Sequence, residues 1–191
     1  MEALNLNLEE TALIVIDLQK GIVGMGGQPY DNQDVVNNNK KLAEAFREKG
    51  GFVTLVHVDF HDGGDALQPI TDQPSASGQS ERPDDWTDMV PELGPESTDL
   101  IVTKRNWGAF FGTDLDLQLR RRGIKNIVLS GIATNIGVET TAREAFQRNY
   151  QQVFATDAMN ALTKEEHDFT VSYMFPKMGR VRSTEDILNN L

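Results

Sequence analysis

Short runs of Val, Ile and Leu alternate with amphipathic segments along this chain of 191 residues, and the alternation limits its possible folds more than any other feature. The first run, Thr11–Ile16, is continuously apolar, which is typical of a strand buried on both faces of a sheet. Such a strand needs a layer of helices on each side. Further strands are expected at residues 52–58, 100–103, 127–130 and 153–155 and, as a short one, near 180–181.

The segments between these runs have the apolar spacing of helices. Residues 35–49 carry their apolar side chains on one face, and the glycine pair that follows predicts where the helix ends. Asp114 is placed to cap the first turn of a helix over residues 114–122. Three more helices are expected: from about residue 136 to 148, from a Thr163/Glu166 capping box to about residue 174, and over residues 184–191.

The alternation of strands and helices predicts an α/β protein: a doubly wound, three-layer αβα sandwich around a six-stranded, mostly parallel sheet. The length suits a single domain spanning residues 1–191, since no internal repeat or linker divides the chain. Residues 62–97 depart from the pattern and hold five of the seven prolines. A long irregular insertion is usually a functional lid or an oligomer arm. An equally possible interpretation is a solvent-exposed excursion that has no function. Trp86 within it could anchor an oligomer interface or fold back onto its own domain.

Charge and hydropathy exclude several partners. The net charge of −11 opposes binding to nucleic acid and to anionic membranes, because phosphate binding needs clustered Lys and Arg. The densest basic cluster, residues 120–122, closes an expected helix, where cations complement the helix dipole. The N-terminus lacks the pattern of a secretory signal, and the longest apolar run falls far short of the roughly twenty residues of a membrane span. We therefore expect a soluble, cytoplasmic protein with no nucleic-acid or membrane partner.

The chain contains no cysteine. Disulfides, thiolate metal sites and a cysteine nucleophile are therefore all excluded.

Polar residues follow two of the apolar strands at the edge where a doubly wound sheet binds ligands. Asp17 ends the first strand and Lys104 ends the third, so the two are expected to face each other. Alternatively, Asp17 caps the next turn and Lys104 is a surface lysine. Gln19, Trp107 and Phe110 are expected to shape a small-molecule pocket beside the pair.

Small and hydroxyl residues follow the fourth strand. At the start of the next helix, free N–H groups would form a cradle for an anion. Gly137 in that first turn is a poor helix former, so its missing side chain is expected to leave space for a ligand.

Three blocks of the sequence resemble the isochorismatase-like, or cysteine hydrolase, family: ALIVIDLQKG, VTKRNWGAFFGTDLDLQLRRRGI and IVLSGIATNIGVETTAREAFQRNY. The resemblance implies a six-stranded parallel sheet between helices, an Asp–Lys–Cys triad and a non-proline cis peptide near the nucleophile. Asp17 and Lys104 match the first two triad members, Gly137 stands at the nucleophile position, and Ala133–Thr134 matches the cis bond. The resemblance also implies a homo-oligomer, a dimer or larger.

Glycine at the nucleophile position implies hydrolysis without a thioester. Ser130 lacks the flanking glycines of a nucleophile elbow, and Thr134 has no evident histidine base. The resemblance implies that isochorismatases also have glycine at the nucleophile position and that they cleave a vinyl ether. Asp17 would then protonate the substrate, with Lys104 orienting it or binding its carboxylate. A general acid needs a raised pKa, which a neighbouring lysine opposes, so burial would have to outweigh Lys104.

The substrate site is expected to be lined by Ala133, Thr134 and Asn135. These three residues resemble the amidase branch of the family, so the sequence predicts the substrate only as a small, carboxylated molecule. A catalytically silent small-molecule-binding or scaffold protein derived from a cysteine amidase is the alternative. Zinc-dependent nicotinamidases of the family carry an Asp-x-His pair near the place of His57, Asp59 and His61. These three could face one way along a strand, but we expect a hydrogen-bonded Asp59 and neither a metal nor another cofactor.

Overall fold

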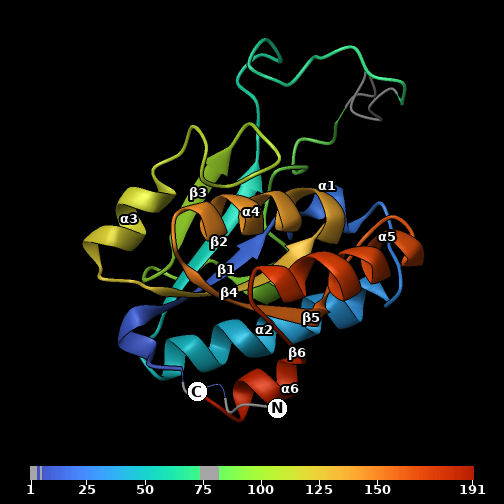
Figure 1. Ribbon diagram of the computed structural model, residues 1–191. Coiled ribbons are helices and arrows are strands. Elements are labelled where there is room, and N and C mark those ends of the chain that lie inside the picture. The colour runs from blue at the N-terminus through green and yellow to red at the C-terminus, as the bar shows by residue number, and fades with distance from the viewer. Residues whose placement is uncertain (1–3, 5, 74–81) are drawn as a thin grey trace.

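A computed structural model describes residue 4 and residues 6–73 and 82–191. At its centre is a six-stranded sheet with the strand order β3-β2-β1-β4-β5-β6, and every pairing is parallel (Figure 1). The strands are β1 (Thr11–Ile16), β2 (Phe52–Val58), β3 (Leu100–Lys104), β4 (Asn126–Ile132), β5 (Gln151–Asn160) and β6 (Arg180–Arg182). The expected α/β fold is confirmed, with an all-parallel sheet.

Helices cover both faces of the sheet (Figure 1). They are α1 (Lys20–Val23), α2 (Asn32–Glu48), α3 (Leu115–Arg121), α4 (Glu139–Gln147), α5 (Lys164–Phe169) and α6 (Thr184–Leu188). Leu13 and Val15 of β1 pack in a cluster with α2 and α6, whereas Ile14 and Ile16 pack in a second cluster with α3 and α4. Because its side chains enter two cores in turn, β1 needs an apolar residue at nearly every position.

Helix and strand ends differ in places from the expectations. The Thr163/Glu166 capping box is present, but Asp114 makes no side-chain cap, because its carboxylate instead accepts from Gln118 Nε2 at 2.8 Å. Asp31 caps α2, which begins at Asn32, three residues before the expected start. The expected helix from 136 is a π-helical turn, Thr134–Val138, followed by α4, and α5 continues into a second such turn, Thr170–Met174. β5 is longer than expected, α6 ends earlier, and α1 was not foreseen.

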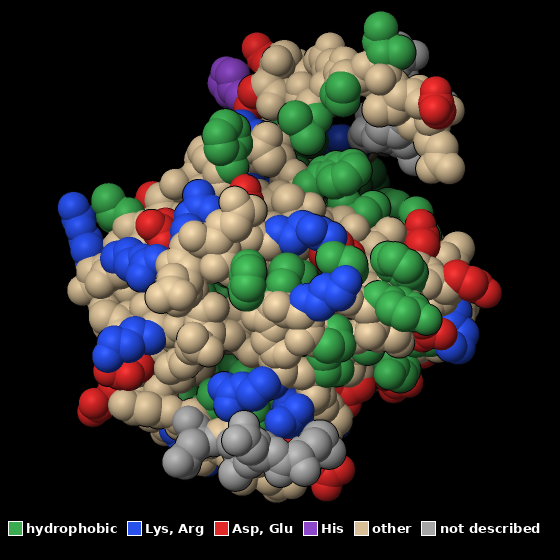
Figure 2. Space-filling view, viewed as in Figure 1, with side chains coloured by type: hydrophobic (Ala, Val, Ile, Leu, Met, Phe, Trp, Pro, Cys, Tyr) green, Lys and Arg blue, Asp and Glu red, His purple; other side chains and the backbone are tan. Residues whose placement is uncertain are grey.

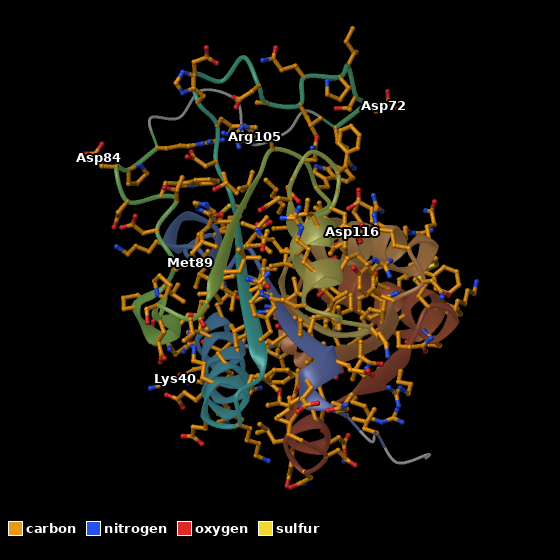
Figure 3. All side chains as sticks on the ribbon, turned by 90° about the vertical axis from the view of Figure 1, so that its left-hand side faces the viewer. Lys40, Asp72, Asp84, Met89, Arg105 and Asp116 are labelled. Atoms are coloured by element: carbon orange, nitrogen blue, oxygen red, sulfur yellow. The ribbon has the colours of Figure 1, made fainter. Side chains whose placement is uncertain are left out.

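The irregular insertion of residues 62–97, called the excursion below, rises above the sheet after β2 and returns along α1 (Figure 1). In its described part it is irregular apart from a 3-10 turn, Pro91–Leu93. Arg105, just past β3, reaches up to it and pairs with Asp65 at 2.5 Å (Figure 3). The half-buried Trp86 packs directly against Gly21. A Cβ added to Gly21 would lie only 2.0 Å from Cδ1 of the indole ring. Trp86 therefore folds back onto its own domain.

The surface gives no sign of a single basic patch on the face that Figure 2 shows, where Lys and Arg lie in small separate groups among other residues. Among the described residues, no helix combines the length and the hydropathy needed to cross a membrane.

Candidate active site

The sheet brings three loops to one edge. β1 pairs with β2 on one side and with β4 on the other, so the strand order reverses beside β1. Asp17 follows β1, Lys104 ends β3, and the turn containing Gly137 follows β4. In doubly wound sheets this reversal, at the carboxyl ends of the strands, is where ligands bind.

Asp17 and Lys104 form a buried ion pair. Lys104 Nζ lies 2.7 Å from Asp17 Oδ2 and also donates to the carbonyl of Asn106 at 3.0 Å. Asp17 is 5% exposed and Lys104 is 3% exposed. Asp17 therefore does not serve as a simple turn cap, and Lys104 is not a surface lysine.

Burial raises the pKa of the Asp17 carboxyl from 3.8 to about 6, although Lys104 and, more weakly, His57 lower it. From the sequence, burial is expected to raise this pKa and Lys104 to lower it, and the effect of burial is the larger of the two. The second oxygen, Asp17 Oδ1, is buried and has no hydrogen-bond partner within the described residues. A carboxyl with this pKa can exchange a proton near neutral pH.

Gly137 completes the group. A Cβ placed on Gly137 would lie 3.2 Å from Asp17 Oδ2, 3.1 Å from Ile16 Cγ2 and 3.4 Å from the Trp107 carbonyl oxygen. The structure therefore brings Asp17, Lys104 and Gly137 together, as the sequence predicts. A Cβ would fit there only if its neighbours moved by a few tenths of an ångström, so the space that the missing side chain leaves beside Asp17 Oδ2 is narrow.

Gly131 permits the ends of β4 and β1 to lie close together. It was not identified from the sequence as a required residue. It has a φ of +114°, and an added Cβ would lie 2.0 Å from the Ile16 carbonyl oxygen. Only glycine fits, so the end of β4 can approach the end of β1. A glycine inside an apolar strand was the available signal.

The turn after β4 differs from the expectation in two ways. The non-proline cis peptide is Ile132–Ala133, one residue before the place implied by resemblance, because the chain turns at the last residue of β4. The amides of Ile136 and Val138 both donate to the carbonyl of the half-buried Ala133 at 3.1 Å. These two amides close the turn, so the expected anion cradle cannot use them.

Thr134 has a histidine partner that the sequence did not reveal. Its hydroxyl lies 2.9 Å from Nδ1 of His167, which α5 contributes from 33 residues further along the chain. Because Thr134 is fully buried, we interpret this contact as docking the turn on α5. Asn135 is half-buried, and its buried Oδ1 has no partner among the described residues.

Two expected pocket residues have other roles. The amide of Gln19 is fully buried and bonds to both backbone groups of Val58 and to the carbonyl of Trp86, which ties the excursion to the segment after Asp17. Phe110 is buried in the core against Tyr150, with ring centroids 5.7 Å apart. Both side chains are thus engaged inside the fold in this structure, and their expected role in shaping the pocket stays a prediction.

Trp107 is 58% exposed, while its backbone carbonyl faces Gly137. Two concave regions, of about 440 and 360 Å³, lie elsewhere, at residues 23–32 and between α2 and α6. The Asp17–Lys104 pair is thus nearly closed off in this conformation, and a substrate would need the surrounding loops to yield.

His57, Asp59 and His61 do not share one face of a strand, because β2 ends at Val58 and His61 lies exposed beyond it. Both ring nitrogens of His57 are engaged, with the Thr87 carbonyl at 3.1 Å and the Thr103 hydroxyl at 2.8 Å. The Asp59 carboxylate accepts from the amide of Phe60. Across the described ranges, no cluster of three or more histidine, aspartate or glutamate side chains is arranged to hold a metal ion.

Known proteins match this chain along almost its whole length. The isochorismatase domain family matches residues 11–186. An isochorismatase family protein of Bacillus subtilis is 57% identical, over 100% of this chain and 99% of its own. Ureidoacrylate amidohydrolase of Acinetobacter baylyi is 32% identical, over 98% and 86% respectively. The structure of an isochorismatase family protein from Burkholderia thailandensis superposes with a TM-score of 0.92 at 45% identity, over 98% of this chain and 97% of that one.

Proposed function

The chain belongs to the isochorismatase family of hydrolases, and on that premise we propose that it hydrolyses a small, carboxylated molecule by acid chemistry on Asp17. The observation that carries the proposal is the buried Asp17 carboxyl, with a pKa near 6 and one oxygen free, beside a glycine in a chain without cysteine. A protein with no thiol cannot form a thioester, and Ser130 lacks the flanking glycines of a nucleophile elbow, so we take water as the nucleophile.

Hydrolysis of a vinyl ether, as in isochorismatase, needs only a proton donor and water. Asp17 donates its proton to the enol-ether carbon, which leaves an oxocarbenium ion on the neighbouring carbon. Water adds to that carbon, and the resulting hemiketal loses its alkoxy group as an alcohol to give a ketone. The Asp17 carboxylate is reprotonated from solvent, so the residue returns to its starting form.

Lys104 has a supporting role in this chemistry. Two of its three N–H donors are directed to Asp17 and to the Asn106 carbonyl, which leaves one for a substrate carboxylate. Lys104 also keeps the Asp17 carboxylate stable after proton donation. The reacting part of the substrate would lie beside Gly137 and the Asp17 carboxyl, on the side of its Oδ2 atom, once the surrounding loops yield to admit it.

Turnover by the purified protein tests the proposal. We expect release of pyruvate from isochorismate by the natural chain and loss of that activity in Asp17→Asn, with both proteins folded by circular dichroism. The similarity to ureidoacrylate amidohydrolase makes a ureido amide the second substrate to assay. Failure of the natural chain on both substrates, with amide hydrolysis gained in Gly137→Cys, would instead support a silent binding protein derived from a cysteine amidase.

A further inference from the structure

The space beside Asp17 has two walls that come from different parts of the chain. One wall is the turn Thr134–Val138, which contains Gly137, and the other is the loop of residues 106–111, whose Trp107 carbonyl faces Gly137. The separation of these walls decides what fits against the Asp17 carboxyl at its Oδ2 atom. Two side chains of α4 that the proposed mechanism does not use connect them.

Thr141 bridges both walls with one hydroxyl group. Its Oγ1 donates to the Gly137 carbonyl oxygen at 2.7 Å and accepts from the Ala109 amide at 3.1 Å. Thr141 is fully buried, so water does not compete for either bond. A hydroxyl group has the one donor and the spare lone pair that this double role requires.

Glu144 holds the same loop from the next turn of α4. Residues three apart on a helix lie on one face, so Glu144 and Thr141 address the loop together. Glu144 Oε2 accepts from the Phe110 amide at 3.0 Å, and a Cβ on Gly108 would lie only 2.2 Å from that oxygen. The loop thus lies directly against the carboxylate, and a side chain at Gly108 would have to separate the two.

We propose that Thr141 and Glu144 are positioning residues that hold the loop 106–111 against the turn 134–138 and so fix the width of the space beside Asp17. Their hydrogen bonds go to backbone atoms of the two walls and not to the Asp17–Lys104 pair. The proposal rests on the proposed function only in taking this space as the place of reaction.

A single introduced thiol tests the proposal without any substrate. Because the chain has no cysteine, Gly137→Cys places its one thiol in the space, where the Cβ fits if its neighbours move by a few tenths of an ångström. The probe is the rate of alkylation by iodoacetamide at fixed pH. In this background we expect Thr141→Val to raise the rate about fivefold to tenfold, since the loss of a hydrogen bond increases the open population of the loop by that order. Thr141→Ser keeps the hydroxyl and stays within about twofold of the parent.

Thr170→Val is the matched control. Thr170 is also fully buried, and its hydroxyl donates to Glu139 of α4 at 2.7 Å, but it makes no bond to the loop 106–111. We expect this variant to lower the melting temperature without raising the alkylation rate. Gly108→Ala acts from the loop side, since its methyl group must separate the loop from the Glu144 carboxylate, and is expected to raise the rate as Thr141→Val does.

The proposal is overturned if Thr141→Val alkylates no faster than Thr170→Val, or if the serine variant reacts as fast as the valine variant. If Gly137→Cys does not fold, amide exchange in the natural chain decides instead: Thr141→Val must speed exchange at Ala109 while Thr170→Val does not. Absence of hydrolysis would refute the proposed function and leave these rates unaffected, so the two failures are distinguishable.

Discussion

The Lys104 ammonium group contacts one oxygen of the Asp17 carboxylate, Oδ2 at 2.7 Å, and the other oxygen, Oδ1, is buried without a partner among the described residues. The two oxygens are therefore not equivalent. A proton taken up by Asp17 belongs on Oδ1, because Oδ2 already accepts from the lysine. From Oδ1 the proton can be donated without first breaking the ion pair.

The rate of isochorismate hydrolysis should fall as pH rises through the Asp17 pKa. That pKa is about 6, and the general acid must carry its proton in the free enzyme. We expect kcat/KM to be flat below this pH and to decrease about tenfold per pH unit above it. The measurement is the pH profile of kcat/KM. A profile that rises through pH 6 would show that Asp17 acts as a base.

Removing Lys104 should move that falling limb to higher pH. Lys104 lowers the Asp17 pKa by its charge and its hydrogen bond, whereas burial raises it. Lys104→Met removes the lowering effect, so the Asp17 pKa should rise further. The same pH profile measures the shift. Lys20→Met removes an exposed ammonium group paired with Asp85 and Asp88 and should leave the limb in place. An equal shift in both variants would point to net charge instead of the pair.

Asp17 also predicts how stability depends on pH. Its pKa is about 6 when folded and 3.8 as an ordinary aspartate, so between these values the folded state binds more protons than the unfolded state. This contribution is fully present below about pH 4 and is lost as pH rises through 6. Urea unfolding from pH 4 to 7 should therefore show the stability of the natural chain relative to Asp17→Asn decreasing with pH. An increase over this window would contradict the raised pKa.

The sequence could predict the fold and the centre of the candidate site because both follow from strand ends. Once Thr11–Ile16 is known to be a parallel strand buried on both faces, Asp17 and Lys104 must emerge at the same edge of the sheet. The turn containing Gly137 follows from the next strand in the same way. No side-chain detail is needed for these conclusions.

Loop side chains could not be assigned in the same way. Phe110 and Trp107 lie three residues apart in one loop, yet Phe110 enters the core and Trp107 is exposed, and the amides of this loop bond to Thr141 and Glu144 of α4. Gln19 likewise resembles a pocket residue until its partner Trp86 is known to return from the excursion. Such contacts join distant segments and leave no local pattern.

Gly131→Ala should be among the most destabilising single substitutions in the chain. The methyl group meets the Ile16 carbonyl oxygen at 2.0 Å, and φ is +114°, so β4 must move away from β1. We expect a loss of at least about 3 kcal/mol in the free energy of unfolding, or no folded protein. Gly63→Ala is the control: φ is +80° with open space around the Cβ, so it should lose only about 1–2 kcal/mol. Equal losses in urea unfolding would show that conformation alone, and not the close approach, requires Gly131.

Filling the space at Gly137 should remove activity in proportion to side-chain size. A methyl group lies 3.1 to 3.4 Å from its nearest neighbours, so Gly137→Ala fits after a small shift, whereas valine and leucine must occupy the space beside Asp17. We expect kcat/KM on isochorismate to fall from alanine to valine to leucine, by about a hundredfold or more at leucine. Overpacking should lower the free energy of unfolding by only about 1–3 kcal/mol, which urea unfolding measures alongside the kinetics. A folded leucine variant with natural activity would place the reaction away from Gly137.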